Sequence, residues 1–307
     1  MQLDSRMPEE LITLALEHSR AGALVETPLA GLKVIRSDVV TGALHSIYEP
    51  CVCFVVQGAK KATVGNKVHR CEPARFFASS ANLPVVGEVI QASAAAPYLA
   101  LILDLDPGVI YEIANGMDFE KPDADSENAG VFTDNVTDAM TNAFLRLMRT
   151  LRLEGDRRII APLIIKEITY YLMQSRFSRV IYELGIKGSG VGRISRSIQK
   201  IRRDFAQPLK VEALARMVDM SPSSFYETFK KITALSPIQF QKQVRLQEAR
   251  KLLATESEDV TSVAYSVGYE SPSQFSREYS RLFGLSPSKD IQELRNIEPH
   301  GPAQKRF

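Results

Sequence analysis

The sequence predicts an α+β fold with a β-rich N-terminal domain and an all-helical C-terminal domain. Residues 31–104 contain many short β-rich runs, and the apolar residues beyond position 136 recur at helical spacing. A capped helical segment also occurs twice in the last third of the chain. A chain of 307 residues is long enough for two domains. We expect these domains to span residues 1–185 and 186–307.

The N-terminal elements follow one another closely. The first twenty residues are acidic with amphipathic helical spacing, which indicates a helix and not a signal peptide. Residues 31–104 predict a small barrel or double-sheet roll, because turn residues separate short strands. The predicted strands are LKVIRS, CVCFVVQG, KATVG, ARFFASS, LPVVGEVIQ and YLALILDL.

A loop and two long helices are expected after the strands. Residues 121–135 are rich in Asp and Asn and predict a polar loop. Helical spacing of apolar residues then runs over 136–152 and 157–175. The glycines between Gly185 and Gly192 predict a helix break or flexible joint, where we place the domain boundary.

The segment Ser221–Pro237 recurs fifty residues later as Ser271–Pro287, with seven of seventeen positions identical. Each copy begins with Ser-Pro, an N-cap followed by proline at the first helical position. Gln274 is expected to complete a capping box with Ser271. A short helix and a tight turn precede each copy, which is the layout of a helix-turn-helix unit, although two ordinary αα-hairpins would share it. The short helices are expected over 211–218 and 260–267.

Each repeated helix has an apolar face and a polar face. The apolar residues share one side at helical spacing and are expected in the core: Phe225, Phe229 and Ile232, then Phe275, Tyr279 and Leu282. The outward residues are small or polar: Ser223, Tyr226, Glu227 and Lys230, then Ser273, Ser276, Arg277 and Ser280.

One further helix connects the two copies. It opens at the cap Ser236-Pro237 and extends to Ala254, which is about 27 Å at ~1.5 Å per residue. Such a rod suits two units that occupy successive major grooves about 34 Å apart. Residues 193–307 hold 19 Lys+Arg against 13 Asp+Glu, whereas the first 192 residues hold 19 against 23. The C-terminal part is therefore the part suited to a polyanion.

The two copies resemble the DNA-binding domain of the AraC/XylS family of bacterial transcription regulators. The signature is LARMVDMSPSSFYETFKK followed by VAYSVGYESPSQFSREYSRLFGLSP. The resemblance implies that the helices opening at Ser221 and Ser271 enter the major groove of promoter DNA. The implied base-contacting residues are Ser223, Tyr226, Glu227, Ser273, Ser276 and Arg277. The implied phosphate-contacting residues are Ser221, Lys230, Lys231, Ser271 and Arg281.

The implied roles differ between the two units. Arg277 fits the acceptor pair of guanine, and Glu227 fits the amino group of cytosine. The first unit carries serines, a tyrosine and an acid where family members often have a basic residue. We therefore expect the second unit to contribute more affinity.

Residues 26–106 resemble the AraC-type N-terminal domain, a cupin-like barrel, in the motifs ETPLAGLKVIRSD, IYEPCVCFVVQGAKKATVG and LPVVGEVIQASAAAPYLALILDLDP. The resemblance implies a regulatory domain that binds a small-molecule effector of unsettled class. We expect a regulator, an activator rather than a repressor, that contacts RNA polymerase and requires no cofactor. Apolar surface left on the helices after the barrel predicts a homodimer, with a monomer as the alternative.

The cysteines Cys51, Cys53 and Cys71 are odd in number and irregularly spaced, which fits a reducing compartment and a cytoplasmic protein. Cys51 and Cys53 lie on the same side of one predicted strand. They are either small buried hydrophobes or, with Cys71, effector-sensing thiols activated by Lys67 or Arg70.

A cupin-type enzyme with a helical appendage is the alternative to a regulator. Metal-dependent cupins need two closely spaced histidines, a glutamate and a later histidine. The four histidines, His18, His45, His69 and His300, include no His-x-His pair, and no phosphate loop or nucleophile motif occurs. No apolar run is long enough to cross a membrane. We expect no metal, no catalytic residue and no membrane partner.

Overall fold

The computed structural model describes residues 6–73, 75–116, 130–175, 177–186, 188–255 and 259–297. These residues form two compact units. The first unit consists mainly of residues up to Ser195 and contains all the described strands. The second consists mainly of residues from Arg196 onward and is helical.

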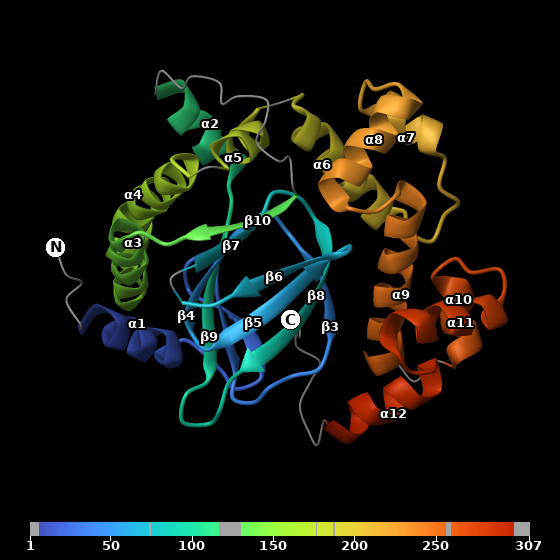
Figure 1. The fold of residues 1–307 in the computed structure, drawn as a ribbon, viewed down its shortest axis with the longest axis horizontal. Coiled ribbons are helices and arrows are strands. Elements are labelled where there is room, and N and C mark those ends of the chain that lie inside the picture. Colours follow the sequence, from blue (N-terminus) through green and yellow to red (C-terminus); the bar gives the residue numbers. More distant parts are fainter. Residues whose placement is uncertain are drawn as a thin grey trace. The chain divides into compact units, whose positions relative to one another are not determined.

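The strands of the first unit form two antiparallel sheets (Figure 1). The larger sheet has the order β1-β2-β9-β4-β7-β10, and the smaller sheet has the order β3-β8-β5-β6. The larger sheet consists of β1 (Ala23–Glu26), β2 (Leu32–Ser37), β4 (Cys51–Gln57), β7 (Arg75–Ser79), β9 (Tyr98–Asp104) and β10 (Val131–Asn135). The smaller sheet consists of β3 (Leu44–Tyr48), β5 (Ala59–Val64), β6 (Lys67–Cys71) and β8 (Leu83–Gln91).

The inner faces of the two sheets pack against each other. Tyr48 of β3 meets Phe77 of β7 edge to face, with ring centroids 5.7 Å apart. Along β5, Lys60, Ala62 and Val64 are buried while Lys61 is exposed, because successive side chains of a strand point to opposite faces. The predicted α+β fold is confirmed. The cupin-like barrel is open, since its strands form two separate sheets and not one closed cylinder.

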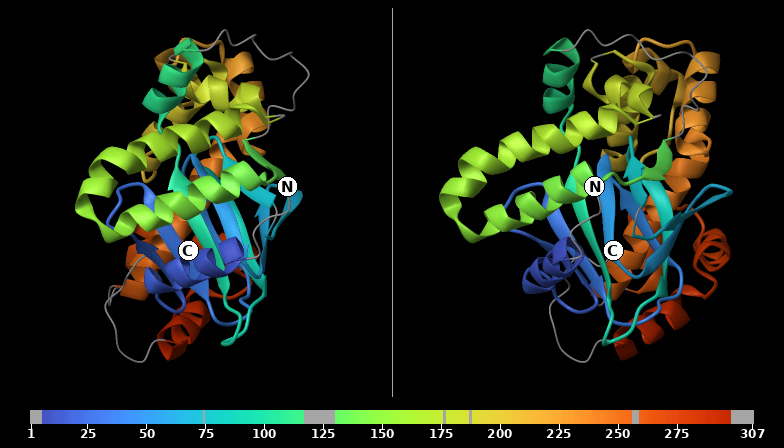
Figure 2. Two further views of the ribbon diagram at one scale, coloured as in Figure 1. Left: turned by 90° about the vertical axis from the view of Figure 1, so that its left-hand side faces the viewer. Right: turned by 60° about the vertical axis from the view of Figure 1, so that its left-hand side comes forward.

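Helices cover the outer face of the larger sheet. Phe54 of β4 stacks on Phe144 of α3 (Asp138–Arg149), with centroids 4.5 Å apart. Helix α1 (Arg6–Glu17), dark blue in Figure 1, contacts β4 and β9, and its Leu14 is buried. Figure 2 shows the yellow-green α3 and α4 (Glu154–Met173) lying side by side on the first unit. The predicted N-terminal helix and the two predicted long helices are confirmed.

The predicted loop over 121–135 is wrong at its C-terminal end. Residues 131–135 form β10, which pairs with β7, while residues 121–129 lie outside the described residues. Phe132 explains the strand, because it is buried and stacks on Phe177 with centroids 4.4 Å apart. Helix α2 (Pro107–Gly116) and strands β1, β3 and β6 were not among the predicted elements.

The predicted helix break near residue 188 is confirmed. Helix α5 (Ser178–Gly185) ends before it, and α6 (Gly190–Arg203) begins after it. Gly188 has a φ of +86°, a left-handed conformation that glycine adopts without a steric penalty.

The second unit contains the repeated segment as two helix-turn-helix pairs. The first pair is α7 (Val211–Met217) and α8 (Pro222–Thr233), and the second is α10 (Val260–Ser266) and α11 (Pro272–Phe283). Helix α9 (Pro237–Thr255) connects them, as the sequence predicts, and a further helix, α12 (Pro287–Ile297), follows the second pair.

Candidate nucleic-acid interface

Serine caps begin both recognition helices, α8 and α11. The backbone N–H of Ser224 donates to Ser221 Oγ at 3.2 Å, and that of Gln274 donates to Ser271 Oγ at 3.3 Å. Each serine thus satisfies one of the amide groups that a helix start leaves without an intrahelical partner.

Only half of the capping box predicted for Gln274 forms among the described residues. The Gln274 N–H donates to Ser271 Oγ, but within those residues no return bond from the Ser271 N–H is present, and the side-chain amide of Gln274 donates to Glu278 Oε1 at 3.1 Å. The reciprocal arrangement occurs at the start of α9. There the Ser236 N–H donates to Gln239 Oε1 at 2.9 Å and the Gln239 N–H donates to Ser236 Oγ at 3.2 Å. The connecting helix therefore has the most completely capped start of the three.

The two tight turns share one hydrogen-bond pattern. Met220 donates its N–H to the Ala215 carbonyl at 3.0 Å, and Tyr269 donates to the Ala264 carbonyl at 3.0 Å. Both bonds close the end of the preceding short helix in the Schellman manner. The second turn is one residue longer, because Glu270 stands before Ser271.

Each turn contains a residue with a left-handed backbone. Asp219 has a φ of 54° and Gly268 a φ of 91°. A Cβ at Gly268 would collide with the backbone carbonyl of Ala206, so the second turn needs glycine for space as well as for conformation.

The apolar faces lie in the core, as predicted. Phe225 and Phe229 are buried, and Phe229 meets Phe240 of α9 edge to face at 5.5 Å. In the second helix-turn-helix pair, Phe275 and Tyr279 are buried on α11. Each recognition helix is thereby fixed in rotation about its axis, and its opposite face is turned outward.

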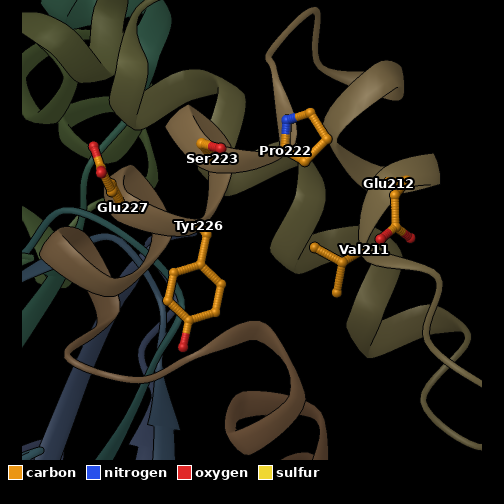
Figure 3. A pocket seen from close by; sticks show the side chains of 6 residues that line it. All are labelled: Val211, Glu212, Pro222, Ser223, Tyr226 and Glu227. Atoms are coloured by element: carbon orange, nitrogen blue, oxygen red, sulfur yellow. The ribbon is translucent and has the colours of Figure 1, made fainter.

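The outward face of α8 carries the three base-contacting residues predicted for the first helix-turn-helix pair. Ser223, Tyr226 and Glu227 are exposed, Tyr226 to 44%. With Pro222 of α8 and the start of α7 at Val211, they border an open depression of about 440 Å³ (Figure 3). A concave surface lined by a phenol, a hydroxyl and a carboxylate presents donors and acceptors to a partner.

The outward face of α11 is more basic. Ser273 and Arg277 are exposed, while Ser276 is partly buried and accepts from the Ser280 hydroxyl at 2.8 Å through its carbonyl. Four of the five residues predicted to contact phosphates are exposed, and Ser271 is partly buried. The exposed four are Ser221, Lys230, Lys231 and Arg281.

The basic residues of the second unit fall into two groups. Within the described part of the chain, Lys230, Arg277 and Arg281 make no ion pair, so their charges remain available to a partner. Lys242 and Arg250 are committed internally, since Lys242 pairs with Glu278 at 2.7 Å and Arg250 with Asp290 at 2.7 Å.

Arg245 is a positioning residue that the sequence did not reveal. From α9, its Nε donates to the Phe205 carbonyl at 2.7 Å and its Nη2 to the carbonyls of Ala206 and Gln207 at 3.1 Å. Its Nη1 donates to the Gly268 carbonyl in the second turn at 2.8 Å. One guanidinium therefore ties both helix-turn-helix pairs to the connecting helix, because residues 205–207 lead into α7.

Glu278 is the centre of a polar group on the inner side of α11. Besides Lys242, it accepts from the Tyr269 hydroxyl at 2.9 Å. Burial acts to raise the pKa of Glu278, but the hydrogen bonds from Lys242, Gln274 and Tyr269 outweigh it and hold this pKa below 4.5. The carboxylate is thus charged at neutral pH and holds α11 against α9.

A second depression of about 270 Å³ lies beside α6 and also went unpredicted. Its rim is basic, with Arg196, Lys200 and Arg203 on α6, and Met217 closes it from α7. The basic residues in the last turn of α6 could have indicated it in the sequence, since they contribute to the excess of positive charge in the C-terminal part.

The three cysteines are buried free thiols in the first unit. Burial raises the pKa of all three. The side chains that oppose this rise in the pKa of Cys53 are Lys60 and Tyr98, not Lys67 or Arg70. A raised thiol pKa lowers the thiolate fraction on which cysteine reactivity depends.

Among the described residues, no three His, Cys, Asp or Glu side chains gather closely enough to hold a metal ion. Over the same residues, no helix is both long and apolar enough to cross a membrane.

The described residues thus combine a double-sheet unit with two helix-turn-helix pairs joined by one helix. A family model described as "AraC-type transcriptional regulator N-terminus" matches residues 28–179. A second, described as "Helix-turn-helix domain", matches residues 214–292. The chain belongs to the AraC-type transcriptional regulators.

Characterised relatives agree with this membership. The chain is 34% identical over 89 residues to the RCS-specific HTH-type transcriptional activator RclR of Escherichia coli (strain K12), covering 29% of this chain and 31% of that protein. It is 36% identical over 90 residues to the MmsAB operon regulatory protein of Pseudomonas aeruginosa, covering 29% of each. The matched segment thus spans about a third of the length of these relatives.

Solved structures share the fold over most of the chain. Apo ToxT from Vibrio cholerae strain SCE256 superposes with a TM-score of 0.56 at 8% identity, covering 88% of this chain and all of that one. ToxT with a bound unsaturated fatty acid gives a TM-score of 0.56 at 10% identity, covering 88% and 97%. At this identity the likeness concerns the fold.

Proposed function

We propose that this protein is a sequence-specific regulator that places α8 and α11 in two successive major grooves of promoter DNA. The observation that carries the proposal is that α8 and α11 each have an outward polar face and that the single helix α9 joins the two helix-turn-helix pairs. Helix α9 has 19 residues, about 28 Å at ~1.5 Å per residue, which is close to one turn of B-form DNA. Arg245 supports the required stiffness by holding the segment that leads into α7 and the turn at Gly268.

The proposed base contacts are Ser223, Tyr226 and Glu227 from α8 and Ser273, Ser276 and Arg277 from α11. Arg277 would donate two hydrogen bonds to guanine, and Glu227 would accept from cytosine. The proposed phosphate contacts are Ser221, Lys230, Lys231, Ser271 and Arg281. The unpaired charges of Lys230, Arg277 and Arg281 support these roles.

The first unit is proposed to bind a small-molecule effector that controls DNA binding. The match to an AraC-type N-terminus supports a regulatory domain, and ToxT, which shares the fold, has been solved with an unsaturated fatty acid. We further propose a boundary between residues 185 and 186, activation of transcription through RNA polymerase, a cytoplasmic location and no catalytic activity. A sensing role for Cys51, Cys53 and Cys71 stays a hypothesis, which their raised thiol pKa values disfavour.

A homodimer is proposed to form through the apolar surface of α4. Leu153, which precedes α4, is exposed to 62%, and Ile159 and Leu163 on the helix are exposed to 66% and 62%. Large apolar side chains that remain exposed together are typical of interaction sites. Two copies related by a two-fold axis would match paired DNA sites.

The test is selection of bound fragments from random DNA, followed by gel-shift titration at low and high salt. Arg277→Ala should weaken binding by about tenfold to a hundredfold at one base position only, which is ~1–3 kcal/mol. Lys230→Ala should weaken binding to all sequences alike and reduce the salt dependence. Unchanged base preference in Arg277→Ala would reject the proposed placement of α11.

A further inference from the structure

The space between the two sheets of the first unit holds a polar cluster that DNA binding does not use. Lys60 on β5 and Cys71 on β6 face it from the smaller sheet, at paired positions. Cys53 on β4 and Tyr98 on β9 face it from the larger sheet. Cys53 interacts electrostatically with Lys60, and Tyr98 interacts with Cys53 and Cys71. Tyr48 on β3 adds a second phenol. We call these five residues the inter-sheet cluster.

Lys60 is held inside the fold by specific features. Its residue is 5% exposed, and its Nζ donates to Tyr48 Oη at 2.7 Å. The neighbouring strand β8 leaves room for it, because a Cβ at Gly87 would lie 2.5 Å from Lys60 Cε and 2.9 Å from Nζ. Burying an ammonium group is costly, so a glycine that makes room for one is unexpected if the residue only fills a core.

The Tyr98 hydroxyl has no explanation in the folded chain. Tyr98 is 0% exposed, and within the described residues its hydroxyl oxygen makes no hydrogen bond of acceptable geometry. The Cys53 thiol interacts with it, but a thiol is a weak partner. Buried hydroxyls without a partner are rare, and each one indicates strain or an absent partner.

The cluster is a set of donors. The Lys60 ammonium, the two phenols and the two thiols all carry hydrogens to donate, and none of these five groups is an anion at neutral pH. Burial raises the pKa of Tyr48, Tyr98, Cys53 and Cys71, which keeps them protonated. The complement of a buried, positively charged donor set is an acceptor-only anion, and a carboxylate is the common small one.

Tyr48 offers a way into the cluster. It lies on β3, which is the edge strand of the smaller sheet, and it is partly exposed, unlike the other four members. Its ring meets Phe77, which His69 also contacts edge to face at 6.0 Å. An entering group would therefore pass an aromatic wall before it reached Lys60.

We propose that the inter-sheet cluster binds the carboxylate of a small organic acid with an apolar body. The Lys60 ammonium and the Tyr98 hydroxyl donate to the carboxylate, and Tyr48 releases Lys60 and acts as the gate. This proposal names organic acids as the chemical class of the effector in the proposed function. Only the link between acid binding and DNA binding rests on that proposed function.

Calorimetric titration of the full-length protein tests the site, with acetate, hexanoate and benzoate as probes. Benzamide serves as the uncharged counterpart of benzoate. We expect at least one acid to bind, and benzamide to bind at least about tenfold more weakly than benzoate, because it lacks the charge. Absence of binding by all three acids, or equal binding of benzoate and benzamide, would overturn the proposal.

Three variants locate the site. Lys60→Met should abolish acid binding. Tyr98→Phe should weaken it about tenfold without lowering the melting temperature, because the hydroxyl makes no hydrogen bond of acceptable geometry in the described residues and interacts only with the weakly bonding Cys53 thiol. Lys61→Met is the matched control, since the Lys61 side chain is 48% exposed on the opposite face of β5. Tyr98→Phe still decides the matter if Lys60→Met fails to fold, and unchanged acid binding in Tyr98→Phe would overturn the assignment.

Gel-shift titration with and without the acid separates this inference from the proposed function. Acid binding that leaves DNA affinity unchanged would support the site and reject effector control through it. Specific DNA binding by a protein that binds none of the acids would reject the site and leave the DNA-binding role intact.

Discussion

The Tyr279 hydroxyl donates a hydrogen bond of 2.7 Å to Oδ2 of Asp290, and this bond ties recognition helix α11 to α12. Asp290 is 3% exposed and also accepts from Nε and Nη2 of Arg250 at 2.7 and 2.8 Å. One buried carboxylate thereby joins α9, α11 and α12. The orientation of the polar face of α11 depends on this joint.

Asp290→Ala should destabilise the protein by about 3–5 kcal/mol, because it leaves Arg250 and Tyr279 without their shared partner. Tyr279→Phe removes one hydrogen bond and should cost about 1 kcal/mol. Urea unfolding followed by circular dichroism measures both. Glu248→Ala is the control, since Glu248 pairs at 2.7 Å with Lys251, whose side chain is 67% exposed, and such pairs contribute about 0–1 kcal/mol. The account of the joint fails if Asp290→Ala costs no more than this control.

Comparing Gly268→Ala with Gly284→Ala distinguishes two costs at the second helix-turn-helix pair: the conformational cost of a left-handed alanine and the steric cost of its Cβ. Both glycines are left-handed, with φ of 91° and 79°. A Cβ at Gly284 meets nothing within 4 Å, so we expect only the conformational cost of about 1–2 kcal/mol. At Gly268 the collision with Ala206 adds about 1–3 kcal/mol of overpacking. Equal melting temperatures for the two variants would show that the contact with Ala206 is unimportant.

Arg245→Met should uncouple the two helix-turn-helix pairs. Loss of the bonds to Phe205 and Gly268 removes the constraint that sets one pair relative to the other. Two linked contacts reinforce each other only when their geometry fits both sites, so affinity for a two-site fragment should fall by about tenfold or more. Affinity for fragments with a single site should change much less. If gel-shift titration showed an equal loss of affinity for both kinds of fragment, Arg245 would support folding alone.

Glu278 gives the second unit a dependence on pH. Its pKa is held below the value of 4.5 that the unfolded chain would show. The carboxylate therefore contributes stability that is fully present above pH ~4.5 and is lost as the pH falls through the folded pKa. The difference in unfolding free energy between the wild type and Glu278→Gln should be constant near neutral pH and shrink on acidification. The effect should be smaller in a Lys242→Met background, and a difference that grew on acidification would contradict this assignment.

Local patterns in the sequence predicted the second unit well, because its features are local. The Ser-Pro caps, the apolar positions of α8 and α11 and the length of α9 depend on residues within a few turns of one another. The contacts of Arg245 and Asp290 join residues far apart in the chain, and no spacing rule indicates them. Only sheet register reveals that Lys60, and not Lys61, faces inward. Strand β10 was missed because its partner β7 lies about fifty residues earlier.

The central claim is that α8 and α11 occupy consecutive grooves on one side of the duplex. Hydroxyl-radical footprinting of the full-length protein on a selected promoter fragment tests it most directly. We predict two protected stretches centred about 10–10.5 base pairs apart on the same face, of which Arg277→Ala loses only the one bound by α11. A single protected stretch, or two that lie on opposite faces of the DNA, would contradict the account.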